Sequence, residues 1–216
     1  MSANRVISKQ VDNAPVIVLD FETTGLSPNH GDRAIEIGAV LIENNEIVDR
    51  FQSLMNPGFM ISSFIESYTG IRNSMVEAAP PCEEVMEQFY DFVDDYPLVA
   101  HNASFDTRFL DSEFQFIGRT RSSLIACSML ASRRIYPHAL NHKLGTLVEY
   151  CGIENDGTFH RALADAEMTG NLWLSMINEI QINYGFEKVS FELMQKISRI
   201  SKAKVFDFLE KESRKA

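Results

Sequence analysis

A short apolar run followed by two carboxylates constrains this chain more than any other feature. Val16 to Leu19 is apolar throughout, and Asp20 and Glu22 follow it. A run of this kind is typical of a buried strand. Because side chains alternate along a strand, Asp20 and Glu22 should point to the same side. Two like charges held together at the end of a buried strand are costly unless a cation lies between them.

Two later patches also carry residues suited to chemistry. One runs from His101 to Asp106, and the other runs from His160 to Ala166. Hard divalent cations prefer oxygen ligands, and a set of four carboxylates and one histidine suits a two-metal site that cleaves phosphodiesters. The members of that set are Asp20, Glu22, Asp106, Asp165 and His160.

In their order and flanking residues, the three patches resemble the motifs of the DnaQ-like 3′–5′ exonucleases. The matching segments are Asp20-Phe21-Glu22-Thr23-Thr24-Gly25, His101-Asn102-Ala103-Ser104-Phe105-Asp106 and His160-Arg161-Ala162-Leu163-Ala164-Asp165-Ala166. The resemblance is to the branch named for four acidic residues and a histidine (DEDDh), which includes the epsilon subunit of bacterial DNA polymerase III and ribonuclease T. It runs from about Val16 to about Met176. Each motif alone is a weak signal, whereas the three together are specific.

This resemblance implies a role for each residue of the set. Asp20, Glu22, Asp106 and Asp165 are implied as ligands of two divalent metal ions, Mg²⁺ or Mn²⁺, and all four count with His160 as catalytic residues. His160 is implied as the general base, since a histidine can accept a proton from water at neutral pH. The implied reaction is metal-dependent hydrolysis at the 3′ end of DNA, with release of nucleoside 5′-monophosphates.

Six further residues are candidates for substrate contact. They are Thr23, Thr24, Gly25, Leu26, Asn102 and Phe105. A glycine at the strand end would let the backbone approach a ligand closely. Leu26 and Phe105 could stack against bases of any sequence, although a plain core aromatic is the alternative for Phe105. Asn102 either hydrogen-bonds the nucleotide or caps the following helix.

The order of the expected elements predicts an α/β fold. Strands are expected at 16–21, 34–43, 46–53 and 98–100, and helices near 62–68, 83–94, 104–116, 128–134, 144–151 and 161–179. Three strands in a meander, followed by alternating strands and helices, give a mixed sheet flanked by helices. This matches the ribonuclease-H-like fold that the resemblance implies, with the active site at the carboxyl end of the first strand.

The length of 216 residues suits one domain with a short appendage. We expect residues 1–14 to be a flexible N-terminal segment and residues 15–183 to be the exonuclease domain. We expect residues 184–216 to form a helical C-terminal extension packed on or beside the domain. No apolar run is long enough to span a bilayer, and the N-terminus lacks the apolar stretch of a signal peptide. The sequence therefore predicts a cytoplasmic protein without a membrane partner.

The net charge of −10 bears on the substrate. Proteins that grip long duplexes usually carry a basic footprint, which is missing here. The charge fits an enzyme that takes a few nucleotides of a single strand or of a DNA 3′ end. Two alternatives stay open: an RNA exonuclease of the same fold, and a proofreading or accessory subunit bound to a DNA polymerase.

One basic cluster departs from this acidic background. Lys196, Arg199, Lys202 and Lys204 are expected on a C-terminal helix. They are either a solvated helix face or a contact surface for phosphates or a partner.

Overall fold

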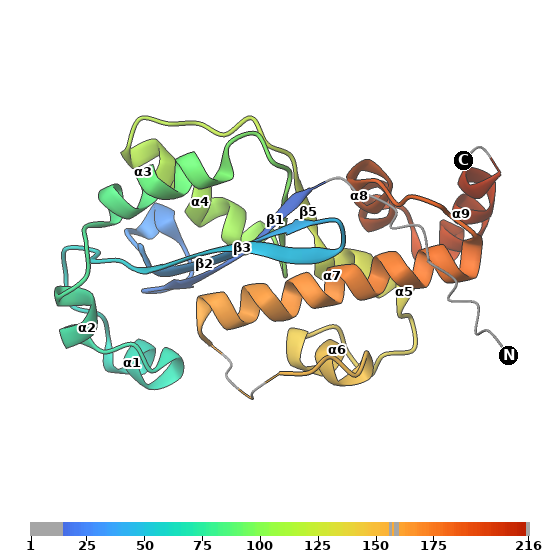
Figure 1. The fold of residues 1–216 in the computed structure, drawn as a ribbon. Coiled ribbons are helices and arrows are strands. Elements are labelled where there is room, and N and C mark those ends of the chain that lie inside the picture. Colours follow the sequence, from blue (N-terminus) through green and yellow to red (C-terminus); the bar gives the residue numbers. More distant parts are fainter. Residues whose placement is uncertain (1–14, 156, 158–159, 215–216) are drawn as a thin grey trace, which may run out of the picture.

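A five-stranded mixed sheet forms the centre of the molecule (Figure 1). The computed structural model describes residues 15–155, 157 and 160–214. The strands, in the spatial order β3-β2-β1-β4-β5, are β1 (Val16–Thr23), β2 (Ala34–Glu43), β3 (Glu46–Leu54), β4 (Leu98–Ala100) and β5 (Ile125–Cys127). The first three strands pair antiparallel, and β4 and β5 join them in parallel. The predicted meander and mixed sheet are confirmed.

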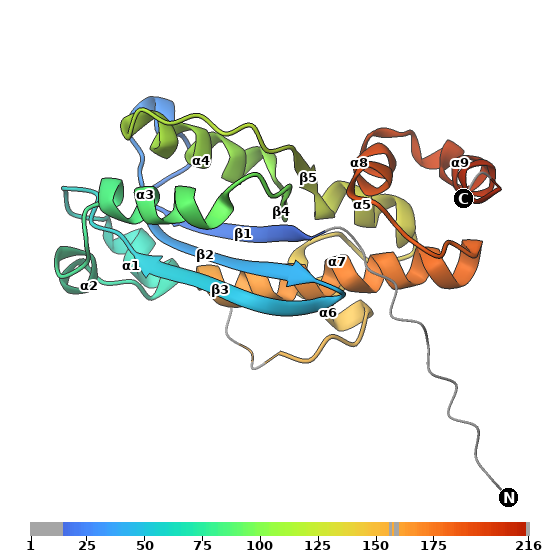
Figure 2. The same ribbon diagram turned by 45° about the horizontal axis from the view of Figure 1, so that its top comes forward.

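Helices cover both faces of this sheet (Figure 2). They are α1 (Ser63–Thr69), α2 (Asn73–Glu77), α3 (Cys82–Val93), α4 (Ser104–Phe116), α5 (Ser128–Ile135), α6 (Leu144–Tyr150), α7 (Ala162–Tyr184), α8 (Phe191–Arg199) and α9 (Val205–Ser213), with short 3₁₀ turns at Pro28–His30 and Lys202–Lys204. Helices α3 and α4 lie on one face and the long α7 on the other, as both views show. Among the described residues, no helix has the length and apolar character needed to cross a membrane.

The alternation of β1 explains the two layers. Ile17, Leu19 and Phe21 pack with the apolar residues of α3 and α4. Val16 and Val18 point the other way and pack with α7. Because side chains alternate along β1, this strand contributes to the apolar cores on both faces of the sheet. Asp20 and Glu22 continue the face that points toward α7.

Two glycines let α7 lie close to the sheet. A Cβ at Gly38 of β2 would come within 2.1 Å of the backbone nitrogen of Leu163. A Cβ at Gly170 of α7 would lie 3.2 Å from Cδ1 of Ile42. The first contact involves backbone on both sides and leaves no room for a side chain. The start of α7 therefore has a fixed position on β2.

The C-terminal helices pack against the end of α7 that is opposite α1 (Figures 1 and 2). Helix α8 contacts α5 and β5, and α9 contacts α7. Helix α7 ends at Tyr184, with Gly185 in the left-handed conformation after it. The segment expected as flexible, residues 1–14, lies outside the described residues.

The basic cluster is not on one helix, so that part of the prediction is wrong. Lys196 and Arg199 lie on α8, whereas Lys202 and Lys204 lie in the following 3₁₀ turn. Ile200 adopts an extended conformation that ends α8, and its carbonyl accepts a hydrogen bond from Arg134 Nε at 2.9 Å. The four cations are exposed but point from two differently oriented segments.

Candidate active site

One open pocket of about 720 Å³ lies at the carboxyl end of β1. The eleven residues that the sequence singled out all line it. Its walls also include residues of α1, α6 and the turn before α4: Ser62, Phe64, Ile65, Tyr68, Thr69, His101 and Leu144. Segments that are far apart in the chain therefore meet in a single space, as expected for the end of a central strand.

Three elements deliver the four carboxylates. Asp20 and Glu22 continue the side of β1 that faces α7. Asp106 lies in the first turn of α4, and Asp165 lies in the first turn of α7. Acidic side chains are favoured in a first turn, where backbone N–H groups are unpaired. Glu22, Asp106 and Asp165 are buried, and Asp20 is half-buried.

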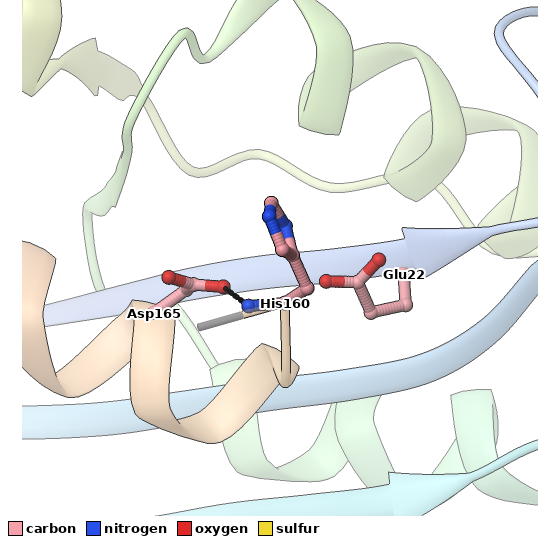
Figure 3. Close-up of side chains that lie close together, drawn as sticks. All are labelled: Glu22, His160 and Asp165. Atoms are coloured by element: carbon pink, nitrogen blue, oxygen red, sulfur yellow. Dashed lines mark hydrogen bonds between the residues drawn. The ribbon is translucent and has the colours of Figure 1, made fainter. Parts of the chain in front are cut away.

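Glu22, His160 and Asp165 form a compact group that could hold a metal ion (Figure 3). One ligand atom from each lies within 4.8 Å of the other two. The His160 backbone adopts a left-handed φ of 62°. Its N–H donates a hydrogen bond of 2.9 Å to Asp165 Oδ2, drawn as the dashed line in Figure 3. Carboxylate oxygens and an imidazole suit a divalent cation.

The carboxylates are held in an environment that disfavours their ionised forms. Burial raises the pKa of Glu22 to about 8, and the charges of Asp165, Glu36 and Asp106 add to this effect. Burial raises the pKa of Asp106 to about 7, against hydrogen bonds from backbone N–H groups. The pKa of Asp20 is raised well above its ordinary value, first by burial and then by the charges of Asp106 and Asp165. A bound cation would favour the ionised forms of these groups.

Asp165 has the same kind of environment. Burial raises its pKa, and hydrogen bonds from the backbone N–H groups of His160 and Arg161 oppose that rise. Asp165 is thus tied to the segment that carries His160 as well as to the carboxylate cluster.

His101 and His142 have structural roles. His101 Nδ1 lies 2.9 Å from Ser128 Oγ, and its Nε2 lies 3.0 Å from the carbonyl oxygen of His142. Burial lowers the pKa of His101 to about 4. The ring of His142 in turn hydrogen-bonds the carbonyl of Tyr136 at 3.1 Å. These contacts connect β4 and α5 with the segment before α6.

The loop after β1 is organised by Asp32. Its carboxylate accepts hydrogen bonds from Ser27 N at 2.9 Å and from Thr24 Oγ1 at 3.3 Å. A Cβ at Gly25 would lie 2.4 Å from Asp32 Oδ1. The structure places the Asp32 carboxylate against Gly25, and contact of this glycine with a ligand stays a prediction. The absence of a side chain at Gly25 lets the Asp32 carboxylate lie directly against this backbone.

The remaining predicted contact residues are placed as follows. Leu26 is 77% exposed at the mouth of the pocket. Phe105 is half-buried and packs on Phe109 with ring centroids 5.0 Å apart. Asn102 is exposed with a φ of 67°, and the N-cap of α4 is Ala103 without a side-chain cap. The capping alternative for Asn102 is therefore wrong.

An aromatic wall on α1 was missed at the sequence level. Phe64 and Tyr68 line the pocket although they are 71% and 53% exposed. Their rings stack with an interplanar angle of 9°, and the Tyr68 ring lies 4.3 Å from that of His160. Their spacing of four residues places both on one helix face. The local sequence pattern, however, does not indicate that this helix face lies near the carboxylates of β1.

An ion pair between a buried glutamate and a partly exposed arginine, beside the carboxylates, was also missed. Glu36 of β2 is 0% exposed and accepts two hydrogen bonds from the guanidinium of Arg161. A charged residue inside an apolar strand is a usable signal, because buried carboxylates need a partner. The identity of the partner depends on tertiary structure.

Comparison with known proteins gives a consistent family. The family model RNase_T, described as exonuclease, matches residues 17–173. The PolC-type DNA polymerase III of Caldanaerobacter subterraneus subsp. tengcongensis is 42% identical over 174 residues, which are 81% of this chain but 12% of that protein. The 3′-5′ exonuclease DinG of Bacillus subtilis is 36% identical over 195 residues, which are 88% of this chain and 20% of DinG. The chain spans only a small part of either relative.

Solved structures agree with this result. Exonuclease X in complex with 5′ overhanging duplex DNA has a TM-score of 0.67 and 26% identity, with 85% of this chain and 99% of that chain covered. The nuclease domain of 3′hExo, a DEDDh family member bound to rAMP, has a TM-score of 0.66 and 23% identity over 76% of this chain and 92% of that chain. The second match bears on the fold alone.

The raised carboxylate pKa values predict an unusual pH dependence of stability. The pKa of Glu22 rises on folding from 4.5 to about 8, and that of Asp106 from 3.8 to about 7. Between these limits the folded protein holds more protons than the unfolded chain, so stability should fall as the pH rises. With a chelator present, we expect the melting temperature to decrease from about pH 5 to about pH 8, and saturating Mg²⁺ or Mn²⁺ to offset the decrease.

Scanning calorimetry of two variants provides the control. Asp20→Asn removes one charge from the cluster and should flatten the metal-free profile and lose most of the metal-induced shift. Asp207→Asn changes an exposed carboxylate on α9 and should behave like the wild type. A metal-free melting temperature that rises over this window would contradict the prediction.

Proposed function

Because this chain belongs to the exonuclease family, we propose that it is a 3′–5′ exonuclease acting on the 3′ end of DNA, on a single strand or a frayed end. The products would be nucleoside 5′-monophosphates. The observation that carries this proposal is the convergence of Asp20, Glu22, Asp106, Asp165 and His160 on one pocket. Phosphodiester hydrolysis is the chemistry that suits such a set.

The donor set fits divalent metal ions, and we assign the four carboxylates as ligands of two of them, Mg²⁺ or Mn²⁺. Three observations support this: oxygen donors predominate, carboxylate oxygens of Glu22 and Asp165 lie within 4.8 Å of each other, and burial and the neighbouring carboxylates raise the pKa values of Asp20 and Glu22. When bound, such ions polarise the phosphate and ease loss of a proton from water.

His160 is the proposed general base. It is exposed to the pocket between Glu22 and Asp165, so its ring can reach a water molecule next to either carboxylate. Its backbone is tied to Asp165, while its ring touches only Tyr68 among the ring contacts of the described residues. This leaves the ring free to accept a proton from the attacking water and to pass it to solvent.

Two apolar walls suit a terminal nucleotide. Leu26 and Phe105 line one part of the pocket, and Phe64 and Tyr68 line another. Flat apolar side chains bind bases by stacking, which tolerates every base. Among the described residues, the pocket lining includes no lysine or arginine, which favours contact with a short stretch of the strand end over a long series of phosphate contacts.

Relatives favour DNA as the substrate. The two relatives named above, both more than 30% identical to this chain, are a DNA polymerase III and a 3′-5′ exonuclease. Exonuclease X was solved with DNA. We extend the proposal to a replication or repair role in the cytoplasm, with a DNA polymerase as a candidate partner, because one relative is itself a DNA polymerase III. The alternative is an RNA exonuclease, which a direct comparison of DNA and RNA substrates would detect.

Polarity and sugar preference test the function as a whole. We expect a 5′-labelled single DNA strand with Mg²⁺ or Mn²⁺ to shorten one nucleotide at a time. A 3′-phosphorylated strand should resist and a 5′-blocked strand should not. The matched RNA strand should be cut more slowly. Efficient cleavage of a circular single strand would show that the protein is an endonuclease and would contradict the proposal.

The base assignment predicts a separable loss of turnover. His160→Asn keeps a residue that tolerates the left-handed backbone and removes the base, so turnover should fall about 10²–10⁴-fold. The metal-induced rise in melting temperature should remain, because the carboxylates are intact. His138→Asn, an exposed histidine outside the pocket, is the control. Unchanged turnover of His160→Asn at saturating DNA would refute the assignment.

The aromatic wall predicts a change in substrate affinity. Phe64→Ala removes a stacking surface without touching a carboxylate or His160, and one stacked base is worth about 1–3 kcal/mol. We expect the Michaelis constant for a single strand to rise about tenfold, with turnover at saturation nearly unchanged. Phe206→Ala removes a comparably exposed phenylalanine from α9 and should have no effect. Equal Michaelis constants for the two variants would exclude stacking on Phe64.

A further inference from the structure

We propose that Glu36 and Arg161 are positioning residues for the start of α7. The buried Glu36 carboxylate holds the Arg161 side chain, and Arg161 in turn holds the backbone of its neighbours His160 and Asp165 in the geometry that the reaction needs. This inference rests on the proposed function, since it assigns a task to residues that touch neither metal nor substrate.

The Glu36 carboxylate is a fully satisfied buried charge. Its two oxygens accept hydrogen bonds from Arg161 Nη2 at 2.8 Å and Arg161 Nε at 3.1 Å. They also accept from Ala162 N at 3.2 Å and from Gln52 Nε2 at 2.9 Å. A planar guanidinium that binds a carboxylate through two nitrogens fixes direction as well as distance. The contact therefore sets the orientation of Arg161.

Arg161 lies between the two residues that it would position. It is the N-cap of α7, directly after His160, and its carbonyl accepts the backbone N–H of Asp165 at 3.0 Å. Asp165 returns a contact, because its Oδ2 accepts the backbone N–H of His160 at 2.9 Å. A shift of Arg161 would move the base and a carboxylate together.

The same strand fixes the other side of this turn. Gly38 lies two residues after Glu36 on the same face of β2, directly against the backbone of Ala162 and Leu163. Glu36 pairs with Glu22 in the register of β1 and β2. The strand next to Glu22 thus also sets the start of α7, and the distance between Glu22 and Asp165 follows from both.

A contribution to folding stability does not by itself explain why an ion pair is present at this position. Replacing a buried ion pair with apolar residues is often neutral or stabilising, because the charges lose their hydration. A charged pair is useful where direction matters. Residues that orient catalytic or ligating groups typically change activity or metal affinity about 10–100-fold when they are replaced.

Steady-state kinetics on single-stranded DNA and Mn²⁺ titrations followed by melting temperature test the proposal. We expect Arg161→Gln and Glu36→Gln each to lower turnover about 10–100-fold, with little change in the Michaelis constant. The Mn²⁺ concentration at half-maximal stabilisation should rise about tenfold for both. Arg161→Lys keeps the charge but not the paired contact, and should remain nearer to Arg161→Gln than to the wild type.

A double variant and two controls separate positioning from folding. Glu36→Gln/Arg161→Gln removes both charges of the pair and leaves no unpaired buried carboxylate, so it should fold. Its turnover should match that of the single variants because the pair acts as a unit. Arg50→Gln breaks the exposed pair between β3 and Glu167 of α7, and should keep wild-type turnover. Met194→Ala lowers stability through a buried residue of α8 and should also keep it.

The outcomes decide between the two proposals. Wild-type turnover and an unchanged Mn²⁺ midpoint in the double variant would overturn the positioning role, as would an equal loss of turnover in Met194→Ala. A wild-type protein without nuclease activity would instead refute the proposed function. In that case the Mn²⁺ midpoint alone decides, and an unshifted midpoint in Arg161→Gln overturns the inference.

Discussion

Mutual repulsion among the carboxylates at the end of β1 is the constraint on which the rest of this structure depends. Asp20 and Glu22 are brought together by strand geometry, and Asp106 and Asp165 are added from the first turns of two helices on opposite faces of the sheet. Burial and like charge both disfavour ionisation there, as the raised pKa values show. A fold can keep such a cluster only if the surrounding elements are held firmly and the ionised forms are stabilised by something other than water.

Specific contacts around the cluster hold these elements in place. Asp32 and Gly25 seat the loop after β1, while His101 connects β4 with α5 and with the segment before α6. On the far side, Glu36 and Gly38 fix where α7 begins. His101, Glu36 and Gly38 join segments distant in sequence, whereas Asp32 acts within its own loop. The four candidate metal ligands lie on the regular elements β1, α4 and α7. The exception is His160, whose left-handed backbone lies just before α7 and is held by Asp165.

Local pattern explains which parts were predictable from the sequence. The run before Asp20 and the meander after it have clear periodicity. The candidate catalytic set was recognised because its motifs match a known family, and the structure places its members in one pocket. β5 was missed because three residues, Ile125–Cys127, form a strand only through pairing with β4. The aromatic wall on α1 was missed because exposed aromatics at helical spacing do not reveal what they face. The partner of Glu36 lies 125 positions away, so no local rule could identify it.

The C-terminal helices share an apolar core with the segment that matches the exonuclease family. The exonuclease match ends at residue 173, yet Trp173 lies in the same apolar cluster as Phe191, Met194 and Leu209. Gln195 of α8 also donates a hydrogen bond to the carbonyl of Ile125 on the edge strand β5. An uncovered edge strand invites pairing with other chains. The segment that matches the family model therefore ends inside an apolar cluster that continues through α8 and α9, and a fragment cut at residue 173 would expose part of that cluster and the edge strand β5.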